Sequence, residues 1–190
     1  MQIVRLPIPE VLLITPTRHG DARGWFSETF RQSALTEAGC PVQFVQDNHV
    51  RSTTKGVLRG LHFQRSPRAQ DKLLRVIQGA IFDVAVDIRL NSPTFGQWVG
   101  AELSAENGVQ LLVPKGFAHG YLTLTDECEV LYKVSDYYAP ETEGTLLWSD
   151  PDIGVAWPLP AAEISTNARD AAAPSLADFQ SPFVFTPAET

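Results

Sequence analysis

The sequence predicts an all-β protein: a double-sheet jelly roll with one or two short helices and an extended C-terminal tail. Apolar and polar residues alternate in many short runs, which is the period of a half-buried strand. Turn signals rich in Gly, Pro and Asn separate these runs, as at 91–93, 106–108 and 114–116. Only residues 31–38, closed by Gly39, are typical of a helix. Short, regularly spaced strands with few helices indicate a sandwich or barrel, and a jelly roll matches the size.

The clearest strand is expected at 81–89. There Phe82, Val84, Val86 and Ile88 share one face, while Asp83, Asp87 and Arg89 share the other. Further strands are expected at 42–50, 57–63, 72–78, 97–103, 109–113, 116–124 and 128–134, and residues 20–28 indicate a turn that enters a strand.

A chain of 190 residues suits one domain with a single core. We expect N-terminal strands over 1–50, a barrel core over 51–138 and a wrapping tail over 139–190. Prolines accumulate in this last segment while the periodicity fades, which predicts extended chain and no second domain.

The formal net charge is −7, from 15 Lys and Arg against 22 Asp and Glu. An acidic protein is a poor general binder of nucleic acid, because that binding needs a basic face. The charge is uneven, however: residues 51–75 contain seven basic side chains and only one acidic side chain, Asp71. A basic strip on an acidic protein indicates a small anionic ligand.

No window approaches the roughly 18 to 20 apolar residues of a membrane span. The two cysteines, Cys40 and Cys128, have no CxxC spacing, which favours reduced thiols in a cytoplasmic protein. No two of the four histidines lie at i, i+2 or i, i+4, so the local signature of a metal site is absent. We expect no metal, although distant histidines can still meet inside a barrel.

Three stretches concentrate side chains that could carry chemistry. Residues 56–64 contain Arg59 and His62, which lie on opposite faces of a regular strand unless a bulge at Gly60 resets the register. Residues 113–121 contain His119 between glycines, and in residues 129–138 Tyr132 alternates with the apolar residues that should face the interior. From the residues alone, His62 is equally compatible with a satisfied core position, and Tyr132 is more typical of a core tyrosine whose hydroxyl bonds to backbone.

The roles of Lys72 and Arg23 are also left open by the residues alone. Lys72 begins a strand, where lysine is often a solubility device. Arg23 lies in a turn, where it could bind a phosphate or pair with Asp21.

Taken together, these stretches resemble the dTDP-4-dehydrorhamnose 3,5-epimerase family, cupin-fold enzymes of deoxysugar nucleotide biosynthesis. The resemblance covers nearly the whole chain, through 21–24, 56–64, 82–89, 92–96, 103–107, 113–120, 131–133 and 136–141. It implies a cupin-type jelly roll and epimerisation of dTDP-4-dehydro-6-deoxyglucose at C3 and C5, through an enolate, to dTDP-4-dehydro-L-rhamnose. No cofactor is implied.

The resemblance also implies roles for individual residues. His62 is the base, Asp170 orients its ring, Tyr132 is the acid on the other face, and Lys72 stabilises the enolate oxygen. An unperturbed imidazole, with a pKa of roughly 6.5, suits proton abstraction near neutral pH. The implied substrate-binding residues are Arg23, Phe26, Glu28, Gln46, Asp47, Asn48, Arg59, His119, Glu143 and Arg169. Of these, Arg23 and Arg59 suit the diphosphate, and Phe26 could stack on the base. A homodimer is implied, with the N-terminal strand crossing to the partner.

The sequence departs from the family pattern before Ala173-Pro174. The family usually carries Ser-x-Lys-Asp there, whereas this chain has Asn167-Ala168-Arg169-Asp170, so arginine replaces the lysine and the charge is kept. His19 is a second departure, at a position that is usually an apolar aromatic.

Other functions remain open from the sequence. The same residues serve an enzyme that acts at C3 or C5 alone. A metal-dependent cupin enzyme and a non-catalytic binder of sugar nucleotides are more distant alternatives.

Overall fold

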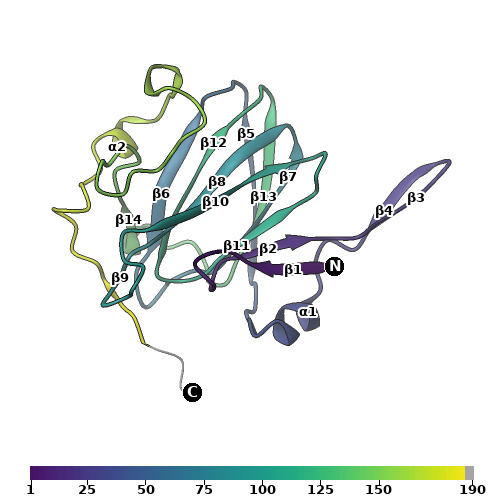
Figure 1. Ribbon diagram of the computed structural model, residues 1–190, viewed down its shortest axis with the longest axis horizontal. Coiled ribbons are helices and arrows are strands. Elements are labelled where there is room, and N and C mark those ends of the chain that lie inside the picture. The colour runs from purple at the N-terminus through teal and green to yellow at the C-terminus, as the bar shows by residue number, and fades with distance from the viewer. Residues whose placement is uncertain (187–190) are drawn as a thin grey trace.

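The computed structural model describes residues 1–186 and consists mainly of two β-sheets packed face to face (Figure 1). In spatial order, the six-stranded sheet contains β1 (Gln2–Arg5), β2 (Leu12–Thr15), β11 (Gln110–Val113), β7 (Lys72–Gln78), β13 (Cys128–Val134) and β5 (Gln46–Ser52). The five-stranded sheet contains β10 (Trp98–Ser104), β8 (Ala80–Asp87), β12 (Phe117–Thr123), β6 (Leu58–Gln64) and β14 (Glu143–Thr145). Neighbouring strands in both sheets are antiparallel, as in a double-sheet jelly roll.

The remaining elements are short. A hairpin of β3 (Arg18–Asp21) and β4 (Gly24–Ser27) projects from the body of the molecule (Figure 1). The others are α1 (Gln32–Glu37), β9 (Arg89–Leu90), η1 (Pro140–Thr142), η2 (Ala161–Glu163), α2 (Ala168–Ala171) and β15 (Phe183–Val184), which pairs in parallel with β9. In the described part of the chain, no helix is long and apolar enough to span a membrane.

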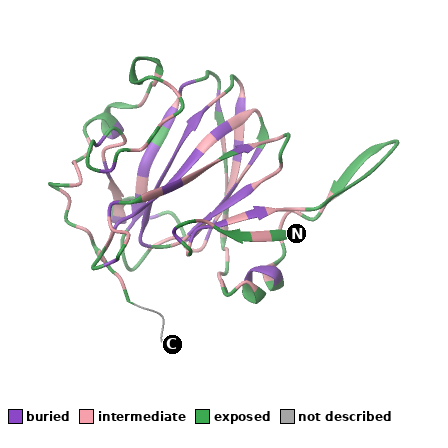
Figure 2. Ribbon diagram, in the orientation of Figure 1, coloured by how far each residue is buried: buried purple, intermediate pink, exposed green. Residues whose placement is uncertain are grey.

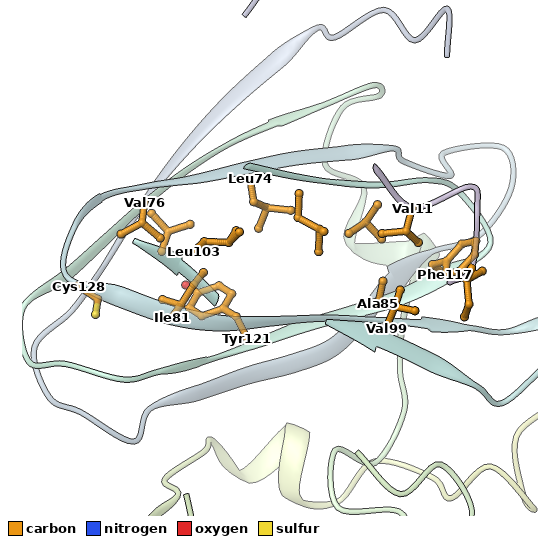
Figure 3. Close-up of a cluster of buried hydrophobic side chains, with 14 residues drawn as sticks. Val11, Leu74, Val76, Ile81, Ala85, Val99, Leu103, Phe117, Tyr121 and Cys128 are labelled. Carbon is orange, nitrogen blue, oxygen red and sulfur yellow. The ribbon is translucent and has the colours of Figure 1, made fainter. Parts of the chain in front are cut away.

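Apolar side chains pack on both faces of the five-stranded sheet. Between the sheets lies a cluster that includes Leu74, Ile81, Val99 and Leu111 (Figure 3). On the outer face, Val84 and Val86 pack with Trp157 and other residues of the C-terminal segment. Residues after β14 therefore cover part of the outer face of this sheet. Residues 187–190, the end of the expected tail, lie outside the described residues.

Most expected strands are confirmed, and two expected ranges need correction. The ranges 72–78 and 128–134 coincide with β7 and β13, but β5 begins only at Gln46. The Val42 N–H donates to the Cys40 carbonyl in a turn instead of a sheet. The strand expected at 81–89 ends at Asp87, and Arg89–Leu90 form the separate short strand β9. The expected helix is confirmed as α1, and Gly39 follows it with φ +81°.

Alternation in β8 is also confirmed, but its polar face points inward. Asp83 and Asp87 are fully buried. Figure 2 shows the contrast between these buried central strands and the exposed β3–β4 hairpin. The interior of the jelly roll is therefore partly polar, which is the first sign of a site between the sheets.

Gly60 accounts for the irregular register between β6 and β12. It has φ +146°, and a Cβ there would lie 2.5 Å from the Gly120 Cα. The pairing of the two strands shifts between His119 and Tyr121. Arg59 and His62 consequently line the same cavity, as a bulge at Gly60 would predict.

Candidate active site

Half-buried His62 and buried Asp170 form a hydrogen-bonded pair on the wall made by the five-stranded sheet. His62 Nε2 lies 2.7 Å from Asp170 Oδ1, and Asp170 is fully buried. The carboxylate comes from α2, where the Asn167 side chain caps the helix by accepting the Asp170 N–H at 2.8 Å. Since a carboxylate can only accept, Nε2 carries the ring proton and Nδ1 is the basic atom.

Burial lowers the pKa of His62, although the hydrogen bond and charge of Asp170 partly oppose this shift. The imidazole is therefore neutral at pH 7. A neutral imidazole held by a carboxylate can accept a proton from a bound molecule.

Lys72 lies beside this pair at the start of β7. Its Nζ donates to the His62 carbonyl at 3.2 Å. Burial lowers the pKa of Lys72 to about 8, while the charges of Asp83 and Glu143 oppose the shift. The ammonium is thus mostly charged at pH 7 and can stabilise a developing negative oxygen.

Tyr132 comes from the opposite wall, on β13 of the six-stranded sheet, and is half-buried. Burial raises the pKa of its hydroxyl, with the positive charge of Arg59 acting in the opposite direction. The hydroxyl is protonated at neutral pH and can donate a proton toward the side of a ligand that faces away from His62.

Two adjoining cavities, of about 320 Å³ and 170 Å³, share His62, Lys72 and Tyr132. The structure brings most of the predicted site residues to these cavities. Gln46, Asn48 and Glu143 line the larger one, and Arg59, His119 and Asp170 line the smaller one.

Arg169 reaches the same site through Glu143. Its Nη1 lies 2.6 Å from Glu143 Oε2, and the Tyr138 hydroxyl donates to the same oxygen at 3.2 Å. The arginine that replaces the family's lysine therefore still places a positive charge at the cavity.

His119 forms a hydrogen bond with Asp83 of the neighbouring strand β8. Its Nε2 lies 2.6 Å from Asp83 Oδ1, and both residues are buried. His119 and His62 are register partners on β12 and β6. Two histidines, each bonded to an aspartate, thus line one cavity.

Four of the predicted residues lie elsewhere in this chain. Arg23, in the hairpin, pairs with Asp21 at 2.6 Å in solvent. Phe26, Glu28 and Asp47 line a further cavity of about 620 Å³, which shares Asn48 and Tyr132 with the site cavities and also contacts Leu73 and Leu131. Those leucines alternate with the inward-facing Leu74 and Val130, so this part of the cavity lies on the outer face of the six-stranded sheet.

Sequence reasoning did not include Asp83, Tyr121, Tyr138 or Asn167 among the candidate site residues. The sequence shows Asp83 only as a polar residue in an otherwise apolar strand. Its burial cannot be predicted without knowing that this face of the strand points inward. Tyr138 and Asn167 lie in segments without periodicity, so their place beside the site depends on how the tail folds.

Comparison with known proteins bears on the identity of this site. The model of the dTDP-4-dehydrorhamnose 3,5-epimerase family matches residues 5–178. The chain belongs to this family. It is 53% identical over 177 residues to the dTDP-4-dehydrorhamnose 3,5-epimerase of Salmonella typhimurium, covering 93% of this chain and 96% of that protein. The predicted family and the predicted enzyme class, an isomerase, are confirmed.

Solved structures of the family confirm the cupin-type jelly roll. The dTDP-6-deoxy-D-glucose-3,5-epimerase of Legionella pneumophila, in complex with dTDP-4-keto-L-rhamnose, matches with a TM-score of 0.90 and 45% identity over 98% of this chain and 99% of that chain. A 3'-monoepimerase of Streptomyces bikiniensis, in complex with dTDP-quinovose, matches with a TM-score of 0.84 and 35% identity over 92% and 87% of the two chains. Both single and double epimerases therefore share this fold.

Proposed function

We propose that this chain converts dTDP-4-dehydro-6-deoxyglucose to dTDP-4-dehydro-L-rhamnose by epimerisation at C3 and C5, in dTDP-rhamnose biosynthesis. One observation carries the proposal: a neutral His62 ring, held by Asp170, and a protonated Tyr132 lie on opposite walls of one cavity. Inversion at a carbon needs a base on one face and an acid on the other, which this arrangement supplies.

The steps follow from the chemistry of the substrate. The C4 carbonyl makes the protons at C3 and C5 acidic, because the carbanion is delocalised as an enolate. His62 Nδ1 takes a proton and becomes positive, Lys72 stabilises the enolate oxygen, and Tyr132 delivers a proton to the opposite face. Before the same steps repeat at the second carbon, His62 releases its proton to solvent and Tyr132 regains one from solvent. These steps require no cofactor.

The remaining lining residues serve as the binding site in this proposal. Arg59 and Arg169 are the cations suited to the diphosphate, while Gln46, Asn48, His119 and Glu143 supply hydrogen-bonding groups to the sugar nucleotide.

Exchange in deuterated water tests the reaction. With dTDP-4-dehydro-6-deoxyglucose as substrate, NMR should show solvent deuterium entering at both C3 and C5. Deuterium at one carbon only would replace the double epimerase by a single-site enzyme, the second candidate, which the similarity to the Streptomyces bikiniensis monoepimerase favours.

Two further measurements separate the more distant candidates. Activity that survives a chelator is expected here, whereas a metal-dependent cupin enzyme would lose it. Substitution His62→Ala should abolish turnover while dTDP still binds, and unchanged turnover would contradict a role for His62 as base.

We also propose that the active form is a homodimer in which the β3–β4 hairpin of one chain reaches the site of the other. Arg23 and Phe26 match family positions that contact the sugar nucleotide, yet their hairpin projects away from the two sheets of its own chain (Figure 1). Trp25 and Phe26 are 60% and 70% exposed, which is typical of an interaction surface. The free thiols Cys40 and Cys128 fit a cytoplasmic location for this dimer.

A further inference from the structure

Tyr121 is a buried tyrosine of the cavity wall that the proposed reaction does not use. It is 4% exposed and lines the 170 Å³ cavity together with His62 and Tyr132. Its hydroxyl oxygen is covered and forms no hydrogen bond within residues 1–186. Leaving a buried hydroxyl unpaired is unfavourable, because the group has lost its hydrogen bonds to water. A partner that forms only during the reaction would account for its presence.

Tyr121 lies where its side chain can approach Tyr132, the proposed acid. It lies on β12, on the same face as His119, and projects between the sheets near Ile81 and Cys128 (Figure 3). Tyr132 packs against the same interior cluster from the opposite sheet. Packed sheets are only about 10 Å apart, so two inward-facing tyrosines can meet between them.

The surroundings of Tyr121 keep its hydroxyl protonated, so that it remains a hydrogen-bond donor. Burial raises the pKa of its hydroxyl; Arg59 opposes that rise and Tyr132 adds to it. Tyr121 therefore stays protonated through the reaction and can donate a hydrogen bond to an anionic neighbour.

Tyr132 becomes such a neighbour in the proposed reaction. When it acts as acid, its O–H bond breaks, a C–H bond forms on the sugar, and the negative charge passes from the enolate to the Tyr132 oxygen. A phenolate in a half-buried cavity is disfavoured unless hydrogen bonds stabilise it. Hydrogen bonds to charged groups are roughly twice as strong as those between neutral groups.

We propose that Tyr121 is a positioning residue for the acid, whose hydroxyl donates a hydrogen bond to the Tyr132 oxygen once that oxygen has given up its proton. After each inversion, solvent returns a proton to Tyr132 and removes the one held by His62. This inference rests on the proposed function, since it requires Tyr132 to act as an acid.

The test is Tyr121→Phe, assayed in deuterated water with dTDP-4-dehydro-6-deoxyglucose. Two rates are followed by NMR: inversion, which needs Tyr132, and exchange without inversion, in which His62 returns a deuteron to its own face. Inversion should fall roughly 10- to 100-fold, the fold-change for one hydrogen bond to a charged group. Exchange without inversion should stay within about twofold of the unsubstituted protein, a split that a purely structural role would not produce.

The second readout is whether the effect of Tyr121→Phe depends on Tyr132. In a Tyr132→Phe background, Tyr121→Phe should cause no further loss, because the oxygen that it stabilises is absent. Thr166→Val is the matched control: Thr166 Oγ1 is also covered and unpaired within the described residues, but it lines neither cavity. The control should leave the ratio of inversion to exchange unchanged.

Equal slowing of inversion and exchange, or a further loss in the Tyr132→Phe background, would overturn the role of Tyr121. If Tyr121→Phe does not fold, Tyr121→Met removes the same donor and is judged by the same two criteria. Absence of any exchange by the unsubstituted protein would instead refute the proposed function.

Discussion

Burial acts on two facing residues of the cavity so that one stays deprotonated and the other protonated. It lowers the pKa of His62 and raises the pKa of Tyr132, so His62, the proposed base, is neutral and Tyr132, the proposed acid, is protonated at the same pH. Asp170 limits the shift on His62 and fixes the ring with Nδ1 as the basic atom. The pair is ready for proton transfer before any ligand binds.

Removing the orienting carboxylate should therefore impair chemistry more than binding. We expect Asp170→Asn to lower kcat by roughly 10²-fold or more, within the range of general base catalysis, because the amide can stabilise the other ring tautomer. KM should change little. Steady-state kinetics, with circular dichroism to verify folding, measure both, and an unchanged kcat would contradict the role of Asp170.

The rate should depend on pH with two limbs. On the acid side, kcat/KM should fall as pH drops through the lowered pKa of His62, below roughly 6.5, because a protonated imidazole cannot accept a proton. On the alkaline side it should fall as pH rises through about 8, where Lys72 loses its charge. A pH profile of kcat/KM measures both limbs.

Lys72→Arg identifies the alkaline group. Arginine stays charged throughout the pH range of the assay, because its guanidinium is not deprotonated there. The residual activity of this variant should therefore lose its alkaline limb near pH 8. An alkaline limb that persists at the same pH would mean that another group titrates there.

At the scale of elements, the crossing of β6 and β12 places the site residues. Gly60 and Gly120 allow the two strands to approach so closely that a Cβ on Gly60 would meet backbone. The register shift at this crossing puts Arg59 and His62 on one cavity. The irregularity is thus part of the site and not a defect of the sheet.

Gly60→Ala should destabilise the fold by more than about 3 kcal/mol, from backbone strain and overpacking together. Activity should fall further than the folded fraction does, because His62 is displaced. Urea denaturation and kcat/KM measure the two effects.

Gly154→Ala is the control for this prediction. Gly154 also has a positive φ, +62°, but its nearest neighbour, the Pro151 carbonyl oxygen, lies at 3.6 Å. This variant should lose only about 1 kcal/mol and keep its activity. Equal losses in the two variants would show that the close approach at Gly60 has no special effect.

At the scale of the whole molecule, a projecting hairpin with exposed aromatic side chains is the feature that a single chain leaves unexplained. Its Trp25 and Phe26 are mostly exposed, and within residues 1–186 the only ion pair of Arg23 is with Asp21. A second copy gives all three a partner in the proposed dimer.

Mixing two inactive variants tests this exchange. His62→Ala and Arg23→Ala chains should each be inactive or nearly so alone. In a mixed dimer, the intact His62 of one chain meets the intact Arg23 of the other, so random mixing should restore about a quarter of the unsubstituted activity. Sizing chromatography verifies the dimer, and no recovery after mixing would place Arg23 in the site of its own chain.

Alternation and turn residues determined much of the fold from the sequence. They located β7 and β13 to the residue and predicted α1, because these patterns are local. His62, Lys72 and Tyr132 were also found from their motifs, and the structure places all three on one cavity.

Only the tertiary structure decided how these residues combine. Asp83 reads as a solvent-facing acid along β8 but points into the jelly roll, because both faces of the sheet are covered. Asp170 is 108 residues from His62 in the sequence, and no local pattern predicts that Asp170 Oδ1 lies 2.7 Å from His62 Nε2. The same holds for Tyr121, whose unpaired hydroxyl is visible only once its neighbours are known. A sequence therefore determines periodicity and the chemistry available, whereas burial, and with it every pKa shift of this site, arises only when distant strands pack together.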